Sequence, residues 1–417
     1  MRSARLAAFA LLLALPGLSR ADSLFYLKDG DRVVFYGDSI TDQRLYTTFV
    51  ETYAVTRFPK LNLTFVHSGW GGDRVTGGGG GPVDVRLERD VEAYKPSVVT
   101  IMLGMNDASY QPFREPIFNT YADGYKHIIE KLKADVPNLR ITVIKPSPYD
   151  DVTREPKFPE GYNSVLVRYG EFLQKLADEA KLDVADLNTS VVEATKKAFA
   201  SDPKGAENLN KDRVHPGPGG QLLMAEALLK AWNAPSVVSS VTINASEGKV
   251  TASDKAEVSD LTVKDGVIRW TQLDEALPFP INLKDEATDL AVRSSDVVEA
   301  LDQQILKVDG LESDYTLTID GENVGTFGKD QLAQGVNLAV LATPMSEQAN
   351  KVHGLTLSHT GLHQMRWRTV QVPYQATNSP NLAKAIEALD ALEAEIIAEQ
   401  KAAAQPKPHT FELKPKA

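Results

Sequence analysis

Short apolar runs alternate with amphipathic stretches between residues 30 and 233 of this 417-residue chain. Continuous apolar runs are typical of strands buried on both faces, whereas apolar residues three or four apart indicate helices. The alternation predicts a parallel sheet covered by helices on both faces, a three-layer, flavodoxin-like α/β/α sandwich. Strands are expected at 32–36, 63–68, 97–103, 140–144 and 182–185, and helices at 47–58, 83–94, 118–134, 164–180 and 221–232.

After Pro235 the pattern changes to period two. Segments such as VTINASEGKVTAS and YTLTIDGENVGTFG alternate apolar and polar residues around Glu-Gly and Asp-Gly turns. This predicts a smaller, mainly β accessory domain at 236–376, with inserted helices such as one at 296–306.

Ser379-Pro380 can cap and start a further helix, which we expect over residues 377–404. The last stretch, 405–417, contains proline and lysine and is expected to be a flexible tail. The expected helix carries an apolar stripe that indicates packing: Leu382, Ile386, Leu389, Leu392 and Ile396.

Residues 1–21 have the features of a signal peptide. Arg2 and Arg5 precede the apolar run Leu6 to Leu15, and Ser19 and Ala21 are small residues at a cleavage site. A buried N-terminal helix is disfavoured by Pro16 and the basic residues. We therefore expect export to the periplasm or the cell exterior, with a first domain at 22–235. No later segment has the length and apolarity of a transmembrane helix.

The amino-acid composition and the net charge limit the kinds of molecule that the protein can be expected to bind. The content of 42% hydrophobic and 24% charged residues is ordinary for a globular protein with a core. The net charge of −11 disfavours binding to phosphate backbones, so no nucleic-acid partner is expected. The sequence has no cysteine, which excludes disulfides.

Candidate chemistry lies where the strands end. Ser39, in Gly37-Asp38-Ser39-Ile40, follows the first strand and should lie at the edge of the sheet where ligands bind, unless it only caps a helix. A serine hydroxyl becomes nucleophilic when an imidazole takes its proton, and that imidazole needs an acceptor on its other nitrogen. Asp212 and His215, three residues apart before a rigid turn, can supply both functions.

Two further groups are expected at the same edge. Asn106 follows the third strand and could donate to a developing oxyanion, although Asn-Asp pairs are also common in turns. A glycine after the second strand, in GWGGD, can present its backbone N–H without a side chain in the way.

The segments GDSI, GWGGD, GMND and DRVH, in this order, resemble the four sequence blocks of the SGNH hydrolases, also called the GDSL esterase/lipase family. The resemblance covers about residues 30–233. It implies Ser39 as nucleophile, His215 as base and Asp212 as the residue that orients the base. It also implies an oxyanion hole from the Ser39 N–H, Gly72 and Asn106, with no cofactor or metal.

The second block departs from the family pattern. The family often has an asparagine near the end of that strand, where this chain has His67-Ser68. We assign His67 a structural or supporting role rather than that of a second base.

The resemblance implies an exported serine ester hydrolase acting on small-molecule or glycan esters, with short acyl groups on carbohydrate favoured. Lysophospholipase, lipase or thioesterase activity stays open. So does a non-catalytic glycan-binding protein, and the sequence leaves the oligomeric state open.

Two other classes of site are disfavoured by the sequence. A nucleotide site at Gly69–Pro82 is disfavoured because no Gly-Lys-Ser/Thr follows the glycines. A metal-dependent hydrolase is disfavoured because no His-x-x-x-His or His-x-His accompanies Asp212 and His215. Within the glycine-rich stretch Gly69–Pro82, we interpret Gly77–Gly81 as a mobile bridge that borders the substrate cleft.

Several residues in the second half of the chain have two interpretations. The histidines could bind metal and the aromatic residues could line a sugar platform, but packing is favoured for both groups. These residues are His353, His359, His363, Trp270, Tyr315, Trp367 and Tyr374.

Overall fold

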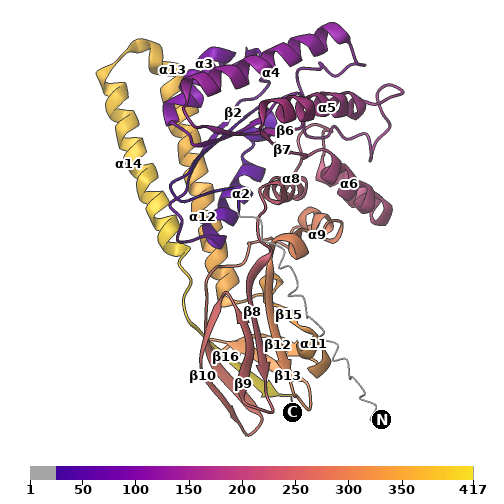
Figure 1. The fold of residues 1–417 in the computed structure, drawn as a ribbon, viewed down its shortest axis with the longest axis vertical. Coiled ribbons are helices and arrows are strands. Elements are labelled where there is room, and N and C mark those ends of the chain that lie inside the picture. Colours follow the sequence, from indigo (N-terminus) through magenta and orange to yellow (C-terminus); the bar gives the residue numbers. More distant parts are fainter. Residues whose placement is uncertain (1–24, 417) are drawn as a thin grey trace, which may run out of the picture.

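The computed structural model describes residues 25–416, so the expected signal peptide lies outside the described part. Its first domain is built on a five-stranded parallel sheet in the order β2-β1-β5-β6-β7. This order and the helices on both faces confirm the flavodoxin-like sandwich (Figure 1). The strands are β1 (Arg32–Gly37), β2 (Thr64–Gly69), β5 (Val98–Met102), β6 (Arg140–Ile144) and β7 (Asp183–Ala185).

Two groups of helices cover this sheet. Helix α2 packs beside α8, and α4 packs beside α3 and α5 on the opposite side (Figure 1). None of the helices within residues 25–416 is both long and apolar enough for a membrane span. The helices are α1 (Ser39–Asp42), α2 (Leu45–Arg57), α3 (Val83–Asp90), η1 (Glu92–Tyr94), α4 (Glu115–Asp135), α5 (Tyr162–Ala180), α6 (Thr189–Ser201), α7 (Pro203–Ala206), η2 (Glu207–Leu209) and α8 (Pro218–Ala231).

The second domain contains two further sheets, in the orders β10-β11-β16-β13-β14 and β15-β12-β8-β9. Trp270 stacks on Phe411 at 5.0 Å between ring centroids, and both rings are buried. The elements are β8 (Val237–Asn244), β9 (Lys249–Asp254), β10 (Ala256–Lys264), β11 (Val267–Asp274), α9 (Glu286–Arg293), α10 (Val297–Leu301), β12 (Gln303–Asp309), β13 (Tyr315–Ile319), β14 (Glu322–Phe327), α11 (Lys329–Gln334), β15 (Val336–Asn337), η3 (Leu338–Val340) and β16 (His409–Pro415).

Two expectations for this domain are wrong. The helix expected at 296–306 ends at Leu301, and β12 follows, because residues 303–309 alternate between the sheet faces and pair with β8. The expected flexible tail at 405–417 contains β16, which lies between β11 and β13 with Phe411 and Leu413 buried. The end of the chain therefore completes the larger of these two sheets.

Residues 344–376, expected within the β domain, are instead mostly helical. They form α12 (Pro344–Gln364), the π-helix η4 (Met365–Gln371), α13 (Val372–Tyr374) and η5 (Gln375–Thr377). Helix α12 packs against α2, β2 and α14 (Pro380–Ala403), so this helical hairpin lies beside the first domain (Figure 1). The sequence pattern hid α12 because half of its buried stripe is polar: Met345, Ala349, Val352, Thr356, His359 and His363.

The start of α14 is as expected, since the Ser379 side chain accepts a hydrogen bond from the Asn381 N–H. The expected apolar stripe is only partly covered, with Leu392 44% exposed.

The glycine run expected to be a mobile bridge is a packed hairpin, formed by β3 (Gly77–Gly78) and β4 (Gly81–Pro82). A Cβ atom on Gly80 would lie 2.5 Å from the Arg86 side chain and 2.7 Å from Trp70. Only glycine permits this approach, so these residues serve close packing rather than mobility.

Candidate active site

The carboxyl ends of three neighbouring strands meet at one edge of the parallel sheet. Gly37, at the end of β1, pairs with Gly69 on β2 and with Met102 on β5. The loops after these strands carry Ser39, Gly72 and Asn106, which the sequence analysis expected to meet here. A side chain on Gly37 would lie 2.3 Å from the Thr41 hydroxyl, so the tight turn into α1 requires glycine.

Ser39, His215 and Asp212 form a line of hydrogen bonds. The Ser39 Oγ lies 2.8 Å from the His215 Nε2, and the His215 Nδ1 lies 2.7 Å from the Asp212 Oδ2. Ser39 begins α1, and the Asp38 side chain caps this helix by accepting from the Ile40 N–H at 3.0 Å. The structure thus brings together three residues from the two ends of the first domain.

The Asp212 side chain stabilises the loop from Asp212 to His215 by hydrogen bonds to its backbone. The Asp212 Oδ1 accepts hydrogen bonds from the backbone N–H groups of Val214, at 2.9 Å, and His215, at 2.7 Å. Burial raises the pKa of the Asp212 carboxyl, but the hydrogen bonds from His215 and Val214 outweigh it and leave the pKa below its ordinary value. Asp212 is therefore an ionised acceptor for the His215 ring at neutral pH.

The two expected oxyanion donors lie on adjacent loops. Gly72 has a φ of +79°, and a side chain added there would meet no atom within 4 Å, so this turn faces open space. The Asn106 Nδ2 donates to the Asp73 carbonyl at 3.1 Å, which leaves its second hydrogen for another acceptor.

Tyr110 is a residue that the sequence analysis missed. Its hydroxyl donates to the Asn106 Oδ1 at 3.0 Å, which fixes the orientation of the Asn106 amide. Ser109 and Tyr110 both have left-handed backbone conformations, with φ of +57° and +55°. Consecutive non-glycine residues in this region are strained and tend to occur at functional sites, but no sequence pattern reveals them.

Three buried carboxyl groups lie beneath these loops. Burial raises the pKa of Asp38 to about 7 and that of Asp107 to about 6, with the neighbouring acids adding to the effect at Asp38. Asp73 accepts from the Arg86 Nε at 2.7 Å, and both side chains are fully buried.

His67 belongs to a separate buried chain of hydrogen bonds. Its Nε2 lies 2.8 Å from Glu51, which lies 2.9 Å from His359. His359 in turn lies 3.1 Å from Glu393, which lies 3.2 Å from His363. A metal ion could be held by Glu51, His67 and His359, because one ligand atom of each lies within 4.8 Å of the other two. All three side chains are, however, already hydrogen-bonded to one another in this network. This chain of hydrogen bonds joins the first domain to α12 and α14.

Of the aromatic residues considered for a sugar platform, only Tyr374 is open to solvent, at 56% exposure. The other three are buried: Trp270, Tyr315 and Trp367.

Comparisons with known proteins point to a family for the first domain. Residues 35–223 match the GDSL-like lipase/acylhydrolase family. An acetylxylan esterase from Geobacillus stearothermophilus is 26% identical over an alignment of 219 residues, which covers 48% of this chain and 93% of that esterase.

One solved structure extends the comparison beyond the first domain. BT4096, a gut microbial diltiazem-metabolizing enzyme, matches 94% of this chain and 99% of its own, with a TM-score of 0.83 and 24% identity. A catalytic mutant of Axe2, an acetylxylan esterase from Geobacillus stearothermophilus, matches 50% of this chain and 96% of its own, with a TM-score of 0.41 and 24% identity. The likeness to BT4096 shows that the complete arrangement of the two domains and the C-terminal helices occurs in another protein.

The fold and the family match define the class of protein. Residues 35–223 form a GDSL-like lipase/acylhydrolase domain of the SGNH hydrolase superfamily, and this domain supports an ester-bond hydrolase.

Proposed function

We propose that the protein cleaves carboxylic esters through an acyl-enzyme on Ser39, with His215 as base and Asp212 orienting the base. The observation that carries this proposal is the line of contacts from the Ser39 Oγ through His215 to Asp212, at 2.8 and 2.7 Å. A hydroxyl in reach of an imidazole whose other nitrogen faces a carboxylate is the arrangement that activates a serine.

The proposed reaction has two halves. The His215 Nε2 accepts the Ser39 proton as the Oγ attacks the ester carbonyl, and the tetrahedral oxyanion is stabilised by the Ser39 N–H, the Gly72 N–H and the Asn106 Nδ2. The C–O bond then breaks, and His215 gives the proton to the leaving alcohol. Water, deprotonated by His215, attacks the acyl-enzyme, and the acid leaves as Ser39 regains its proton.

For the substrate, we propose small-molecule or glycan esters with short acyl groups, such as acetyl groups on carbohydrate. The 26% identity to an esterase named for acetylxylan supports this choice. Lysophospholipase, lipase and thioesterase activities are the alternatives within the same family. Non-catalytic glycan binding is not supported, because Ser39, Asp212 and His215 are all present and in contact.

We also propose that the protein is exported and works in the periplasm or outside the cell. The basic start, the short apolar run and the small residues around Ala21 support this localisation. Sequencing the N-terminus of the protein recovered from a culture fraction tests it, with Asp22 as the expected first residue.

The mechanism is tested by labelling with a fluorophosphonate, which phosphonylates an activated serine. Mass spectrometry of the digested protein should find the adduct on Ser39, and His215→Ala should abolish it. Prior incubation with EDTA should not change the labelling or the hydrolysis of p-nitrophenyl acetate. Absence of the adduct, or activity lost to EDTA and restored by a divalent ion, would refute the serine mechanism.

A chain-length series of p-nitrophenyl esters tests the substrate. We expect kcat/KM to fall from acetate to octanoate and acetate to be released from acetylated xylan. A preference for long acyl chains would favour the lipase alternative, and a preference for acyl thioesters would favour the thioesterase.

A further inference from the structure

Asp42 connects the helix that begins with Ser39 to the turn that carries Gly72. It is the last residue of α1, and its Oδ2 accepts a hydrogen bond from the Gly71 N–H at 3.3 Å. The backbones of the two segments are also close together, since a Cβ atom on Gly69 would lie 2.1 Å from the Asp42 nitrogen. The position of Asp42 is thus coupled to the position of the Gly71–Gly72 peptide.

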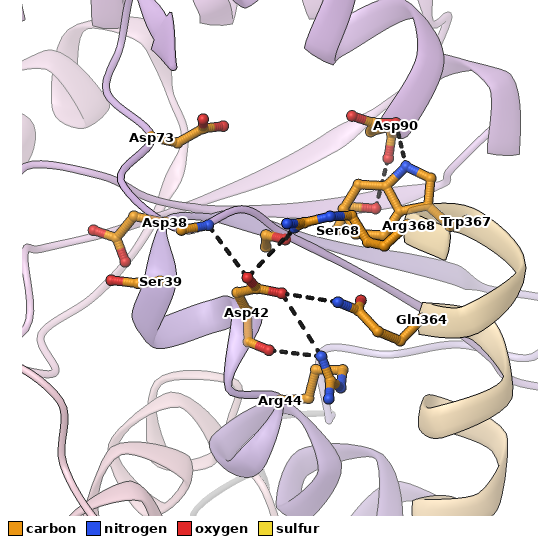
Figure 2. A network of polar contacts seen from close by, with 12 residues as sticks. Asp38, Ser39, Asp42, Arg44, Ser68, Asp73, Asp90, Gln364, Trp367 and Arg368 are labelled. Atoms are coloured by element: carbon orange, nitrogen blue, oxygen red, sulfur yellow. Dashed lines mark hydrogen bonds and ion pairs between the residues drawn. The ribbon is translucent and has the colours of Figure 1, made fainter. Parts of the chain in front are cut away.

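Two side chains from the C-terminal helical hairpin bind the same carboxylate (Figure 2). The Gln364 Nε2 donates to the Asp42 Oδ1 at 3.3 Å, and an Arg368 guanidinium nitrogen lies 3.4 Å from the Oδ2. Arg368 also donates to the Gly69 carbonyl at 3.5 Å, and its guanidinium lies over the Trp70 ring at 3.4 Å from the centroid. Arg368 therefore contacts both the end of α1 and the residues just before Gly71.

The neighbouring Trp367 anchors Arg368 in this place. Its side chain is fully buried, and its Nε1–H donates to the Asp90 carboxylate at 2.6 Å. Its ring also meets Trp70 edge to face at 5.6 Å. These residues lie in η4, a π-helix of seven residues, and π-helical turns occur frequently at functional sites.

We propose that Arg368 is a positioning residue of the active site, supplied by a segment more than 300 residues away from Ser39 in the sequence. Together with Gln364 it holds the Asp42 carboxylate, and through Asp42 and Trp70 it fixes the turn that presents the Gly72 N–H. This inference rests on the proposed role of Gly72 as an oxyanion donor. It assigns the C-terminal helices a part in catalysis.

The physical reason is that an oxyanion donor stabilises the transition state only when it is held in place beforehand. Arg44 also lies 3.7 Å from the Asp42 Oδ1, so Asp42 keeps one charged partner in Arg368→Gln but loses the one on its Oδ2. Trp70 loses the stacked guanidinium as well, and the Gly71–Gly72 peptide gains freedom. A misplacement of about 1 Å can cost about 100-fold in rate. We expect kcat on p-nitrophenyl acetate to fall about 10-fold or more, with KM changed less than about twofold.

Arg366→Gln is the matched control. Arg366 lies on the same π-helix, but its guanidinium pairs with Asp390 on α14, away from Asp42. This variant should keep the wild-type kcat even if its melting temperature falls. Arg368→Lys keeps the charge but not the flat face over Trp70, so its kcat should lie between those of wild type and Arg368→Gln.

Two further measurements separate positioning from a purely structural role. The affinity for an alkylboronic acid, which forms a tetrahedral adduct on an active serine, should weaken by the same factor as kcat in Arg368→Gln. In a double-mutant cycle, Asp42→Asn/Arg368→Gln should lose less than the sum of the two single variants, because both changes break the Asp42–Arg368 contact. If Arg368→Gln does not fold, Gln364→Ala takes its place, with an expected fall in kcat of about threefold.

Wild-type kcat in folded Arg368→Gln, an effect on KM alone, or additive losses in the cycle would overturn the inference. Activity of Ser39→Ala separates this failure from failure of the proposed function. An inactive Ser39→Ala with a fully active Arg368→Gln overturns only the role of Arg368. An active Ser39→Ala overturns the serine mechanism itself.

Discussion

The buried chain from His67 to His363 predicts how the stability of the protein depends on pH. His359 is packed between Glu51 of α2 and Glu393 of α14, with His67 of β2 beside it. Burial alone lowers the pKa of His359, but the charges and hydrogen bonds of Glu51 and Glu393 outweigh it and raise the pKa from 6.5 to about 10. Burial keeps His67 neutral, with a pKa lowered to about 4.

The sign follows from the direction of the shift. Because the folded protein binds the His359 proton more tightly than the unfolded chain, this contribution to stability is complete below about pH 6.5 and is lost as the pH rises towards 10. Between pH 7 and 9 the loss is on the order of 2–3 kcal/mol, since each tenfold difference in proton affinity is worth about 1.4 kcal/mol. On the acid side, the pKa of Glu393 is lowered to about 2, so its contribution is lost as the pH falls from about 4.5 towards 2.

His359→Gln removes the ionisable group and keeps an amide that can donate to one carboxylate. We expect the variant to be less stable than wild type at pH 7 and the difference to shrink by a few kcal/mol, on the order of 2–3, at pH 9. Urea unfolding followed by tryptophan fluorescence at both pH values measures the difference. Parallel pH dependences in the two proteins would refute the reasoning, because the proton on His359 would then not contribute.

The remaining predictions concern the loops around Ser39. Asn106→Ala should lower kcat by about 100-fold or more through loss of one oxyanion donor, with an unchanged melting temperature; full activity would exclude this role for Asn106. Tyr110→Phe removes one hydrogen bond to Asn106 and should lower kcat about fivefold with little change in KM, whereas no change would mean that the Asn106 amide is oriented without it. Gly80→Ala should lower the melting temperature because its Cβ would overlap Arg86 and Trp70, whereas Gly354→Ala, in the open middle of α12, should not; equal effects would contradict the packing argument.

The first domain could be predicted from the sequence because its signals are local. Each strand is a short apolar run, and the turns that carry Ser39, Gly72 and Asn106 follow three strands directly. The carboxyl ends of parallel strands must meet at one edge, so chain order alone placed these residues near one another. His215 and Asp212 were recognised by their spacing and by the order of the four sequence blocks.

The C-terminal half was harder to predict because its packing is polar and non-local. Helix α12 buries His359 and His363 against carboxylates of α2 and α14, and no apolar periodicity marks such a face. β16 looked like a tail because its partners, β11 and β13, are distant in sequence. The contact of Arg368 with Asp42 spans 326 residues, and the glycine hairpin depends on Trp70 and Arg86 filling the space beside it.

The central claim is that Ser39 is the nucleophile of an ester hydrolase. The most direct test is the kcat of purified Ser39→Ala on p-nitrophenyl acetate, with Ser190→Ala, an exposed surface serine, as the control. The account predicts that Ser39→Ala loses about 10⁴-fold or more while keeping the wild-type melting temperature, and that Ser190→Ala keeps full activity. A Ser39→Ala protein within about tenfold of wild type would contradict it.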